Sequence, residues 1–201
     1  MSLLVESIKI LNGRLYNMAF HEARVNETRH KLFGITMPIS LRHSIVIPSD
    51  VHQGLVKCRV TYDSNIRNIT FQPYKPRSIQ SIKLIIDDNI FYDFKYEQRA
   101  ELNALFEQRI GHDEIMIIKN GLVTDAYYYN YVFEKDGHFF TPATPLLQGT
   151  MRAFLISKQK ISPKDIYVDD LKKYDFIYMI NALTPLGHIK ITPSQDRKSV
   201  V

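Results

Sequence analysis

Residues 94–142 decide the fold class, and they read FKYEQRAELNALFEQRIGHDEIMIIKNGLVTDAYYYNYVFEKDGHFFTP. Residues 96–110 carry apolar side chains at helical spacing and stop at Gly111, which predicts an amphipathic helix. Its buried stripe is expected to be Leu102, Leu105, Phe106 and Ile110. Two strand–turn–strand patterns follow, with Asn120-Gly121 and Asp136-Gly137 at the turns. This order of helix and hairpins predicts an α+β fold.

The N-terminal part of the sequence also predicts hairpins and an amphipathic helix. Residues 3–18 alternate around Asn12-Gly13, which predicts a hairpin with a tight turn. Residues 19–34, AFHEARVNETRHKLFG, predict an amphipathic helix that ends at Gly34. Residues 55–63 and 66–74 alternate on either side of a polar turn and predict a second hairpin. On the C-terminal side, residues 149–158 predict a short helix and residues 176–183 a buried strand.

A boundary between two lobes is predicted at PYKPRS, residues 73–78. Its two prolines cannot donate to a sheet ladder, so the segment is expected to be a linker or a crossover. We therefore expect an α+β lobe over residues 1–74 and a second, β-rich lobe over residues 75–201.

The composition excludes several classes of protein. The chain has 201 residues, of which 45% are apolar and 23% charged, as is usual for a globular protein with a core. No apolar run approaches the roughly 20 residues of a spanning helix, so no membrane partner is expected. The net charge of +5 is spread along the chain without a basic block, which suits a small anionic ligand better than nucleic acid. The single cysteine, Cys58, excludes an internal disulfide and fits a cytoplasmic location.

Common catalytic motifs are missing. The sequence has neither a GxGxxG nor a P-loop motif, so nothing supports a dinucleotide or Walker-type site. Its seven histidines are scattered and form no HExxH motif, and there is only one cysteine, so no metal site is expected. The functions that stay open are catalysis without a metal ion and ligand binding without catalysis.

Three segments carry candidate functional residues. Lys95 lies near the end of the aromatic run IFYDFKY, residues 90–96, which is expected to be a strand; partial burial there would lower the pKa of the amine and make it nucleophilic. Gly149-Thr150 opens a helix whose first N–H groups suit an anion. Arg24 lies on the first helix and suits a phosphate. From the residues alone, each has a plain alternative: a solvated lysine, an ordinary helix cap and a surface charge.

Taken together, these segments resemble the class IV aminotransferases, the fold-type IV pyridoxal-phosphate enzymes. Residues 94–142 followed by GTMRAFLI resemble the family core, most closely that of 4-amino-4-deoxychorismate lyase. The earlier stretch ESIKILNGRLYNMAFHEAR resembles the N-terminal hairpin and the H-x-x-R helix of the family. The order and spacing of the pieces carry the resemblance. It implies two small lobes, as in D-amino-acid aminotransferase, with a C-terminal β-rich pseudobarrel flanked by helices.

The resemblance implies roles at the matching positions. Lys95 corresponds to the Schiff-base lysine, whose amine also moves the proton at the substrate Cα. Arg24 corresponds to the phosphate-binding arginine. Asp125 corresponds to the acid at the pyridine nitrogen, and Asn130 to the asparagine that follows it. The other implied contacts with pyridoxal 5'-phosphate come from the helix start and from the loop of residues 181–184: Gly149, Thr150, Met151 and Leu183.

The sequence departs from the family pattern in three places. Asp125 is one methylene shorter than the usual glutamate. The chain begins at VESIKI, later than its relatives, so the N-terminal lobe is expected to be shortened. Tyr62 takes the place of an arginine that binds the substrate carboxylate in the lyase. Arg59 is close in sequence, but its odd separation puts it on the opposite strand face. Weak candidates for substrate contact are therefore Arg59, Tyr62 and Thr184.

The implied function is a pyridoxal-phosphate enzyme acting on an amino acid or an aminodeoxychorismate-like amine. The reaction is transamination or β-elimination that releases pyruvate. The resemblance also implies a homodimer. The alternative is a relative without catalysis that serves as a small-ligand or protein-binding module.

Overall fold

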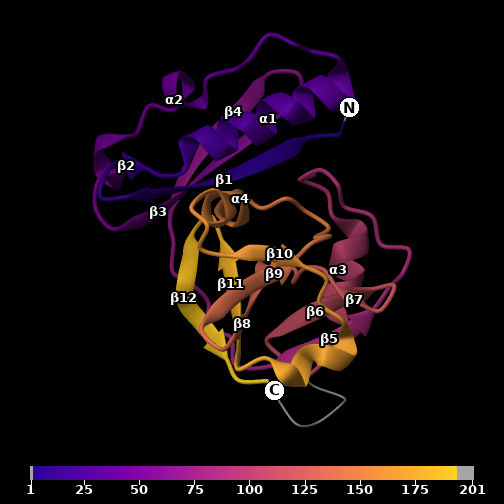
Figure 1. Ribbon diagram of the computed structural model, residues 1–201. Coiled ribbons are helices and arrows are strands. Elements are labelled where there is room, and N and C mark those ends of the chain that lie inside the picture. The colour runs from indigo at the N-terminus through magenta and orange to yellow at the C-terminus, as the bar shows by residue number, and fades with distance from the viewer. Residues whose placement is uncertain (1, 194–201) are drawn as a thin grey trace. The chain divides into compact units, whose positions relative to one another are not determined.

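The computed structural model describes residues 2–193, and their packing separates the chain into two compact units (Figure 1). Unit 1 comprises Met1–Pro76 and Phe94–Gln98, and unit 2 comprises Arg77–Asp93 and Arg99–Val201. The segment that carries Lys95 thus packs with unit 1, although it follows the first stretch of unit 2 in the sequence.

Unit 1 is built on an antiparallel sheet with the strand order β2-β1-β3-β4. The strands are β1 (Leu4–Leu11), β2 (Arg14–Leu15), β3 (Leu55–Tyr62) and β4 (Ile66–Pro73). Asn12 and Gly13 have φ of 48° and 73°, as a tight hairpin turn requires. Both hairpins predicted for this part of the sequence are confirmed.

Helix α1 (Met18–Phe33) packs on this sheet (Figure 1). It ends at Gly34, whose φ of 68° is the left-handed conformation of a helix C-cap, as predicted. The helix buries Met18 and Val25 against Ile8 and Ile10 of β1. The proline-rich connection to β3 contains helix α2 (Leu41–Ser44) and the short 3₁₀ helix η1 (Ser49–Val51).

Unit 2 contains two sheets. The larger has the order β10-β9-β8-β11-β12, and the smaller has the order β5-β6-β7. Their strands are β5 (Ile82–Ile86), β6 (Glu114–Lys119), β7 (Leu122–Val123), β8 (Asn130–Lys135), β9 (His138–Pro142), β10 (Ser162–Lys164), β11 (Phe176–Asn181) and β12 (Thr184–Ile191). The helices are α3 (Ala100–Glu107), α4 (Thr150–Ser157) and the 3₁₀ helix η2 (Val168–Lys173).

One apolar core lies between the two sheets of unit 2. It joins Ile82 and Met116 of the smaller sheet to Tyr131, Phe133 and Met179 of the larger one. Helix α4 covers a second cluster, in which Met151 packs with Val132 and Ile180. The Asn-Gly and Asp-Gly hairpins predicted from the sequence are confirmed here as β6–β7 and β8–β9. Within residues 2–193, no helix combines the length and the apolarity needed to span a bilayer.

One predicted helix is shorter than expected, and one predicted strand is absent. The helix predicted over residues 96–110 occupies only Ala100–Glu107, and Ile110, expected in its buried stripe, is 79% exposed. After Glu107 the backbone closes two shorter turns, and the Arg109 guanidinium lies 4.0 Å from the Phe106 ring, so Ile110 faces away from the core. The aromatic run at residues 90–95 is not a strand, and only Tyr96 pairs with β1, at Leu4.

Candidate active site

In unit 1 the backbone fixes Lys95 beside the first residues of β1. The Lys95 carbonyl accepts a hydrogen bond from the Val5 N–H (2.9 Å), and the Glu97 N–H donates to the Leu3 carbonyl (2.8 Å). The Lys95 side chain is half-buried. The amine is therefore attached to an ordered segment that is anchored on the edge of the sheet.

A buried ionic cluster lies one residue further along β1. Glu6 has no exposed surface and accepts two hydrogen bonds from Arg24, from Nε (2.8 Å) and Nη2 (2.6 Å). Its Oε2 also lies 2.6 Å from Nδ1 of His21, which is equally buried. His21 and Arg24 are three residues apart and share one face of α1. A buried carboxylate needs such partners, and here it fixes the Arg24 guanidinium in place.

The cluster has a defined protonation state. Burial alone would raise the pKa of Glu6, but the charge of Arg24 and the hydrogen bonds from His21 and Arg24 outweigh it and lower the pKa to about 2. Burial lowers the pKa of His21, and the positive charges of Arg24 and Lys95 lower it further against the effect of Glu6. At neutral pH the cluster thus holds an ionised Glu6, a charged Arg24 and a neutral His21 that donates from Nδ1. The positive charge of Lys95 is among the causes that lower the pKa of His21, so the Lys95 amine acts electrostatically on the cluster.

The two weak substrate candidates of unit 1 lie on opposite faces of β3, as their spacing predicts. Arg59 pairs with Glu97 at 2.9 Å, and both side chains are 36% exposed. Tyr62 is 1% exposed and belongs to the apolar core, where burial raises the pKa of its hydroxyl. Of these two residues, Arg59 is the one that a solute can reach.

In unit 2 the candidate ring acid and its asparagine are in direct contact. Asp125 Oδ1 accepts from Asn130 Nδ2 (2.7 Å), and Asp125 Oδ2 accepts from the Leu147 N–H (2.8 Å). Asn130 Nδ2 also donates to the Leu147 carbonyl at 3.0 Å. The two residues form a backbone bridge that closes the short loop 126–129, with the Ala126 N–H donating to the Tyr129 carbonyl (2.9 Å).

Burial raises the pKa of Asp125 to about 7. The hydrogen bonds from Leu147 and Asn130, and the charge of Arg152, act in the opposite direction but do not cancel the burial. Near neutral pH the carboxyl group is thus balanced between its two protonation states. A cation placed next to it would favour the ionised form.

The start of α4 is packed against the same asparagine. Gly149 is the N-cap, and no side chain caps the helix there. A Cβ at position 149 would lie 1.8 Å from Asn130 Oδ1, so only glycine fits. Thr150 and Met151 follow as the first, buried residues of the helix. The start of α4 is therefore fixed beside the Asp125–Asn130 pair.

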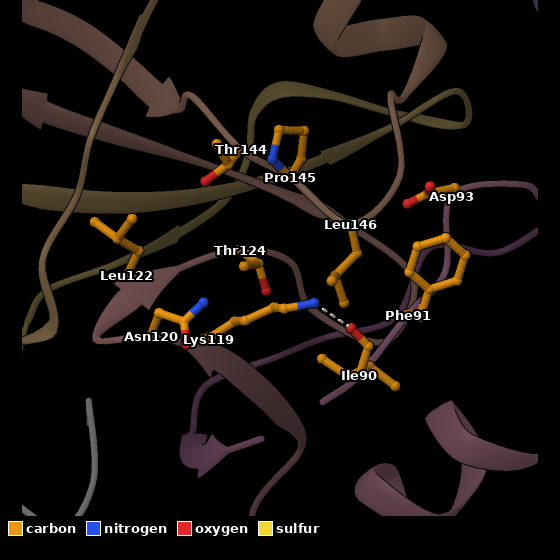
Figure 2. A pocket seen from close by; sticks show the side chains of 10 residues that line it. All are labelled: Ile90, Phe91, Asp93, Lys119, Asn120, Leu122, Thr124, Thr144, Pro145 and Leu146. Carbon is orange, nitrogen blue, oxygen red and sulfur yellow. Dashed lines mark hydrogen bonds between the residues drawn. The ribbon is translucent and has the colours of Figure 1, made fainter. Parts of the chain in front are cut away.

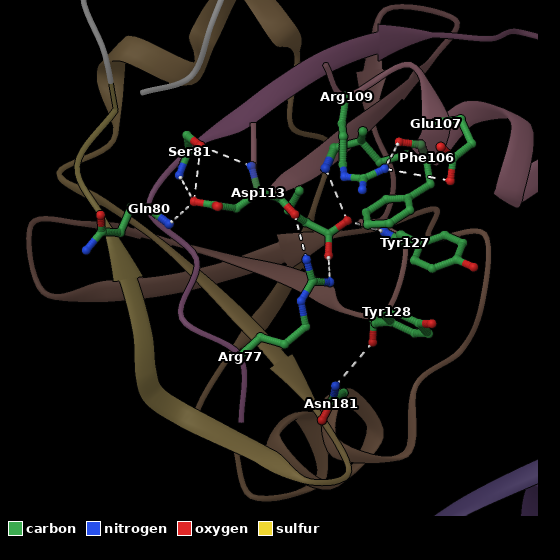
Figure 3. Close-up of polar contacts among 12 residues, drawn as sticks. Arg77, Gln80, Ser81, Phe106, Glu107, Arg109, Asp113, Tyr127, Tyr128 and Asn181 are labelled. Atoms are coloured by element: carbon green, nitrogen blue, oxygen red, sulfur yellow. Dashed lines mark hydrogen bonds and ion pairs between the residues drawn. The ribbon is translucent and has the colours of Figure 1, made fainter. Parts of the chain in front are cut away.

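The loop between β11 and β12 adds Leu183 and Thr184. Asn181 Oδ1 accepts from both their N–H groups at 2.9 Å, and Asn181 Nδ2 donates to the Tyr128 carbonyl at 3.3 Å (Figure 3). Both Leu183 and Thr184 are buried. The Thr184 hydroxyl has no hydrogen-bond partner among residues 2–193. An isolated buried hydroxyl of this kind has the capacity to bind a ligand oxygen.

No role in the site was predicted from the sequence for three residues: Glu6, His21 and Arg152. Glu6 was recognisable as a charge at a core-facing position of an alternating strand, and His21 as the first residue of the H-x-x-R pattern. Arg152 ends the pattern G-x-x-R; it donates to Gln148 Oε1 (2.6 Å) and to the Pro142 carbonyl (2.9 Å), which ties α4 to β9.

A separate cavity of about 320 Å³ lies in unit 2 (Figure 2). Lys119 points across it and donates to the Ile90 carbonyl at 2.7 Å. None of the candidate residues lines this cavity, although its wall includes Thr124 and Leu146, the sequence neighbours of Asp125 and Leu147. In the described part of the chain, no three His, Cys, Asp or Glu side chains gather where they could hold a metal ion.

Replacing Glu6 by glutamine tests the buried cluster. Because the folded state keeps Glu6 ionised down to a pH of about 2, its contribution to stability is complete above pH 4.5 and is lost as the pH falls toward 2. That contribution is on the order of 3 kcal/mol. Urea unfolding between pH 7 and pH 3 should show this loss in the wild type, and Glu6→Gln should lack this part of the pH dependence.

The control is Glu27→Gln, since Glu27 pairs with Lys31 on the surface and is 62% exposed. This variant should keep the wild-type pH dependence. An identical acid profile for Glu6→Gln and wild type would contradict the assigned ionisation.

Comparison with known proteins gives a consistent result. The family model "Amino-transferase class IV" matches residues 3–191. An uncharacterised protein of Haemophilus influenzae is 35% identical over 185 residues, which cover 91% of this chain and 98% of that protein. A crystal structure from Haemophilus somnus, provisionally assigned as a 4-amino-4-deoxychorismate lyase, has 32% identity and a TM-score of 0.87; the match covers 92% of this chain and 98% of that one.

A more distant structure shares the fold. It is the pyridoxal-phosphate-bound form of a hypothetical aminotransferase from Mycobacterium tuberculosis, with 15% identity, a TM-score of 0.77 and coverage of 100% of this chain and 83% of that one. The family and the fold class predicted from the sequence are confirmed. The chain belongs to the class IV aminotransferases, a family of enzymes that depend on pyridoxal phosphate.

Proposed function

We propose that this enzyme acts on an aminodeoxychorismate-like amine or on an amino acid, and that Lys95 is its catalytic lysine. The observation that carries the proposal is the contact among Asp125, Asn130 and Gly149. These residues come from two segments of the sequence, around residues 125–130 and at residue 149, and each was expected to serve the same cofactor. Their packing in one place supports a common task.

The residues of unit 2 fit pyridoxal phosphate. The start of α4 offers N–H groups to a phosphate. The Thr184 hydroxyl is buried without a partner among the described residues, which suits a further ligand oxygen. Asp125 accepts hydrogen bonds from Asn130 and from the Leu147 N–H, and a carboxylate has room for about four, so it keeps acceptor capacity for a ring nitrogen. Asn130 and the Leu147 N–H would hold the acid in position for it.

The residues of unit 1 have complementary tasks in the proposal. Lys95 would attach the cofactor covalently, and Arg24 would bind its phosphate. Glu6 orients Arg24 through two hydrogen bonds, and His21 in turn holds Glu6 in place.

When bound, pyridoxal phosphate supplies an electron sink for the carbon that bears the substrate amine. Lys95 would take the proton from that carbon. For an aminodeoxychorismate-like amine, the C–O bond at the neighbouring carbon then breaks, pyruvate leaves with a proton, and the ring becomes aromatic. For transamination, the proton returns to the cofactor side and water releases a keto acid.

The proposal also includes a homodimer and a cytoplasmic location. The first follows from the family resemblance and the second from the single cysteine, Cys58.

Lys95→Ala should abolish covalent cofactor binding. Wild-type protein incubated with pyridoxal phosphate should gain a visible absorbance band, and borohydride should convert it into a stable adduct that mass spectrometry maps to Lys95. The variant should lack the band and should lose activity by about 10³-fold or more. The matched control is Lys119→Ala, because Lys119 is a half-buried lysine engaged with the Ile90 carbonyl. An adduct at another lysine would overturn the assignment.

Pyruvate release separates the two reactions. With 4-amino-4-deoxychorismate and no keto acid, we expect the enzyme to release pyruvate, because elimination needs no amino acceptor. Coupled oxidation of NADH by lactate dehydrogenase measures the product. A strict requirement for a keto acid would assign the enzyme to transamination instead.

Gly149→Ala should disrupt the cofactor site through Asn130. The new Cβ meets Asn130 Oδ1 at 1.8 Å, so the amide must move and Asp125 loses its donor. We expect a loss of about 1–3 kcal/mol in stability and weaker binding of pyridoxal phosphate. In an Asn130→Ala background the clash is gone, and the same substitution should cost much less. Additive effects in this double-mutant cycle would show that the two positions do not interact.

A further inference from the structure

Arg99 is a charged side chain that the protein holds in place without neutralising it. It is the N-cap of α3 and is half-buried. Its guanidinium lies 4.3 Å from the Tyr127 ring centroid and 4.7 Å from that of Tyr128. Nη1 donates a long hydrogen bond, 3.4 Å, to the Tyr127 carbonyl. Among residues 2–193, Arg99 forms no ion pair with a carboxylate.

Three other arginines that are buried or half-buried are engaged differently. Arg24 and Arg77 are paired with the buried carboxylates of Glu6 and Glu114, at 2.6 Å and 3.3 Å. Arg29 donates to backbone carbonyls at 2.7 Å and 2.9 Å. Arg99 thus keeps an unused capacity for charge-assisted hydrogen bonds.

Further contacts hold the ring of Tyr127 and the backbone of Tyr128 in place. Tyr127 stacks on Phe106 at 4.1 Å with an interplanar angle of 11°, and its hydroxyl donates to Asn103 Oδ1 at 2.6 Å. Its N–H donates to the buried Glu114 at 3.2 Å. The Tyr128 carbonyl accepts from Asn181 (Figure 3). The guanidinium therefore rests against a rigid aromatic frame, which reduces the entropy lost when it binds a ligand.

This frame belongs to the loop of the proposed cofactor site. Tyr127 and Tyr128 lie in the loop that Asp125 and Asn130 close at its two ends. Asn181 ties the same loop to the N–H groups of Leu183 and Thr184. Within unit 2, the free charge of Arg99 is thus held by the residues that connect the proposed ring acid to its asparagine.

We propose that Arg99 binds a carboxylate of the substrate and so selects planar amines that carry an acid group. This inference rests on the proposed function. The two tyrosine rings cover part of the half-buried guanidinium, so a bidentate carboxylate there is worth more than at a fully solvated surface. The position expected to bind this group from the family pattern is Tyr62, which is buried in the core of unit 1.

The test compares binding of 4-aminobenzoate and its neutral analogue 4-aminobenzamide by calorimetry, with the full chain loaded with pyridoxal phosphate. Wild type should prefer the acid. Arg99→Gln should weaken binding of the acid by roughly 10- to 100-fold and change binding of the amide by less than about 2-fold. Arg99→Lys should restore part of the preference. The matched control is Arg109→Gln, since Arg109 also lies on an aromatic ring, that of Phe106, near the same helix.

Two outcomes would overturn the proposal: no preference for the acid in wild type, or an unchanged preference in Arg99→Gln. Equal weakening of both probes would assign Arg99 a purely structural role and would also contradict it. The visible band of the bound cofactor serves as an independent readout. If wild type gains no band but its preference for the acid depends on Arg99, the carboxylate site stands and the proposed function falls.

Discussion

The rest of the candidate site in unit 2 depends on the hydrogen bonds and the packing of the Asn130 side-chain amide. Its Nδ2 has two protons, and they go to Asp125 and to the Leu147 carbonyl. Its Oδ1 fills the space that the missing Cβ of Gly149 leaves. One side chain at the start of β8 thus fixes the acid, the approach to α4 and the helix start. A shift of this amide would disturb all three together, because protein interiors are close-packed.

The buried carboxylates of the two units show how partners decide a protonation state. Glu6 and Asp125 are both buried, yet the pKa of Glu6 is about 2 and that of Asp125 about 7. Glu6 receives two hydrogen bonds from an arginine, whereas Asp125 is held by an amide and a backbone N–H. At Asp125 these neutral donors, together with the charge of Arg152, do not offset the effect of burial on the pKa. Asp125 is therefore an acid that lacks a directly bonded cation, which is the environment that a protonated ring nitrogen would complete.

Local signals in the sequence were sufficient for much of the fold. The Asn-Gly and Asp-Gly turns were predicted correctly, because only a few residues adopt the positive φ that such turns need. The end of the first helix at Gly34 was predicted correctly for the same reason, since Gly34 also has a positive φ. The helix predicted over residues 96–110 is shorter than expected at its start, because periodicity cannot show that residues 94–98 pack with unit 1 and that Tyr96 pairs with Leu4. Burial of Ile110 was inferred from spacing alone, and the chain turned before reaching it.

The sequence predicted less of the site geometry than of the fold. The resemblance proposed residues one by one, but which side chain holds which depends on contacts between distant segments. The residues around Glu6 in the sequence do not indicate that α1 supplies its two partners. Those around Arg99 do not indicate that two tyrosines of a later loop lie against its guanidinium. The setting of the shorter acid at position 125 also depends on its contacts in the folded chain. Its carboxylate is reached by its own neighbours, Asn130 and Leu147, because it stays close to the backbone bridge. A glutamate has one more methylene and would carry its carboxyl group further from this bridge, whereas the aspartate carboxyl group lies where the side-chain amide of Asn130 and the Leu147 N–H both reach it.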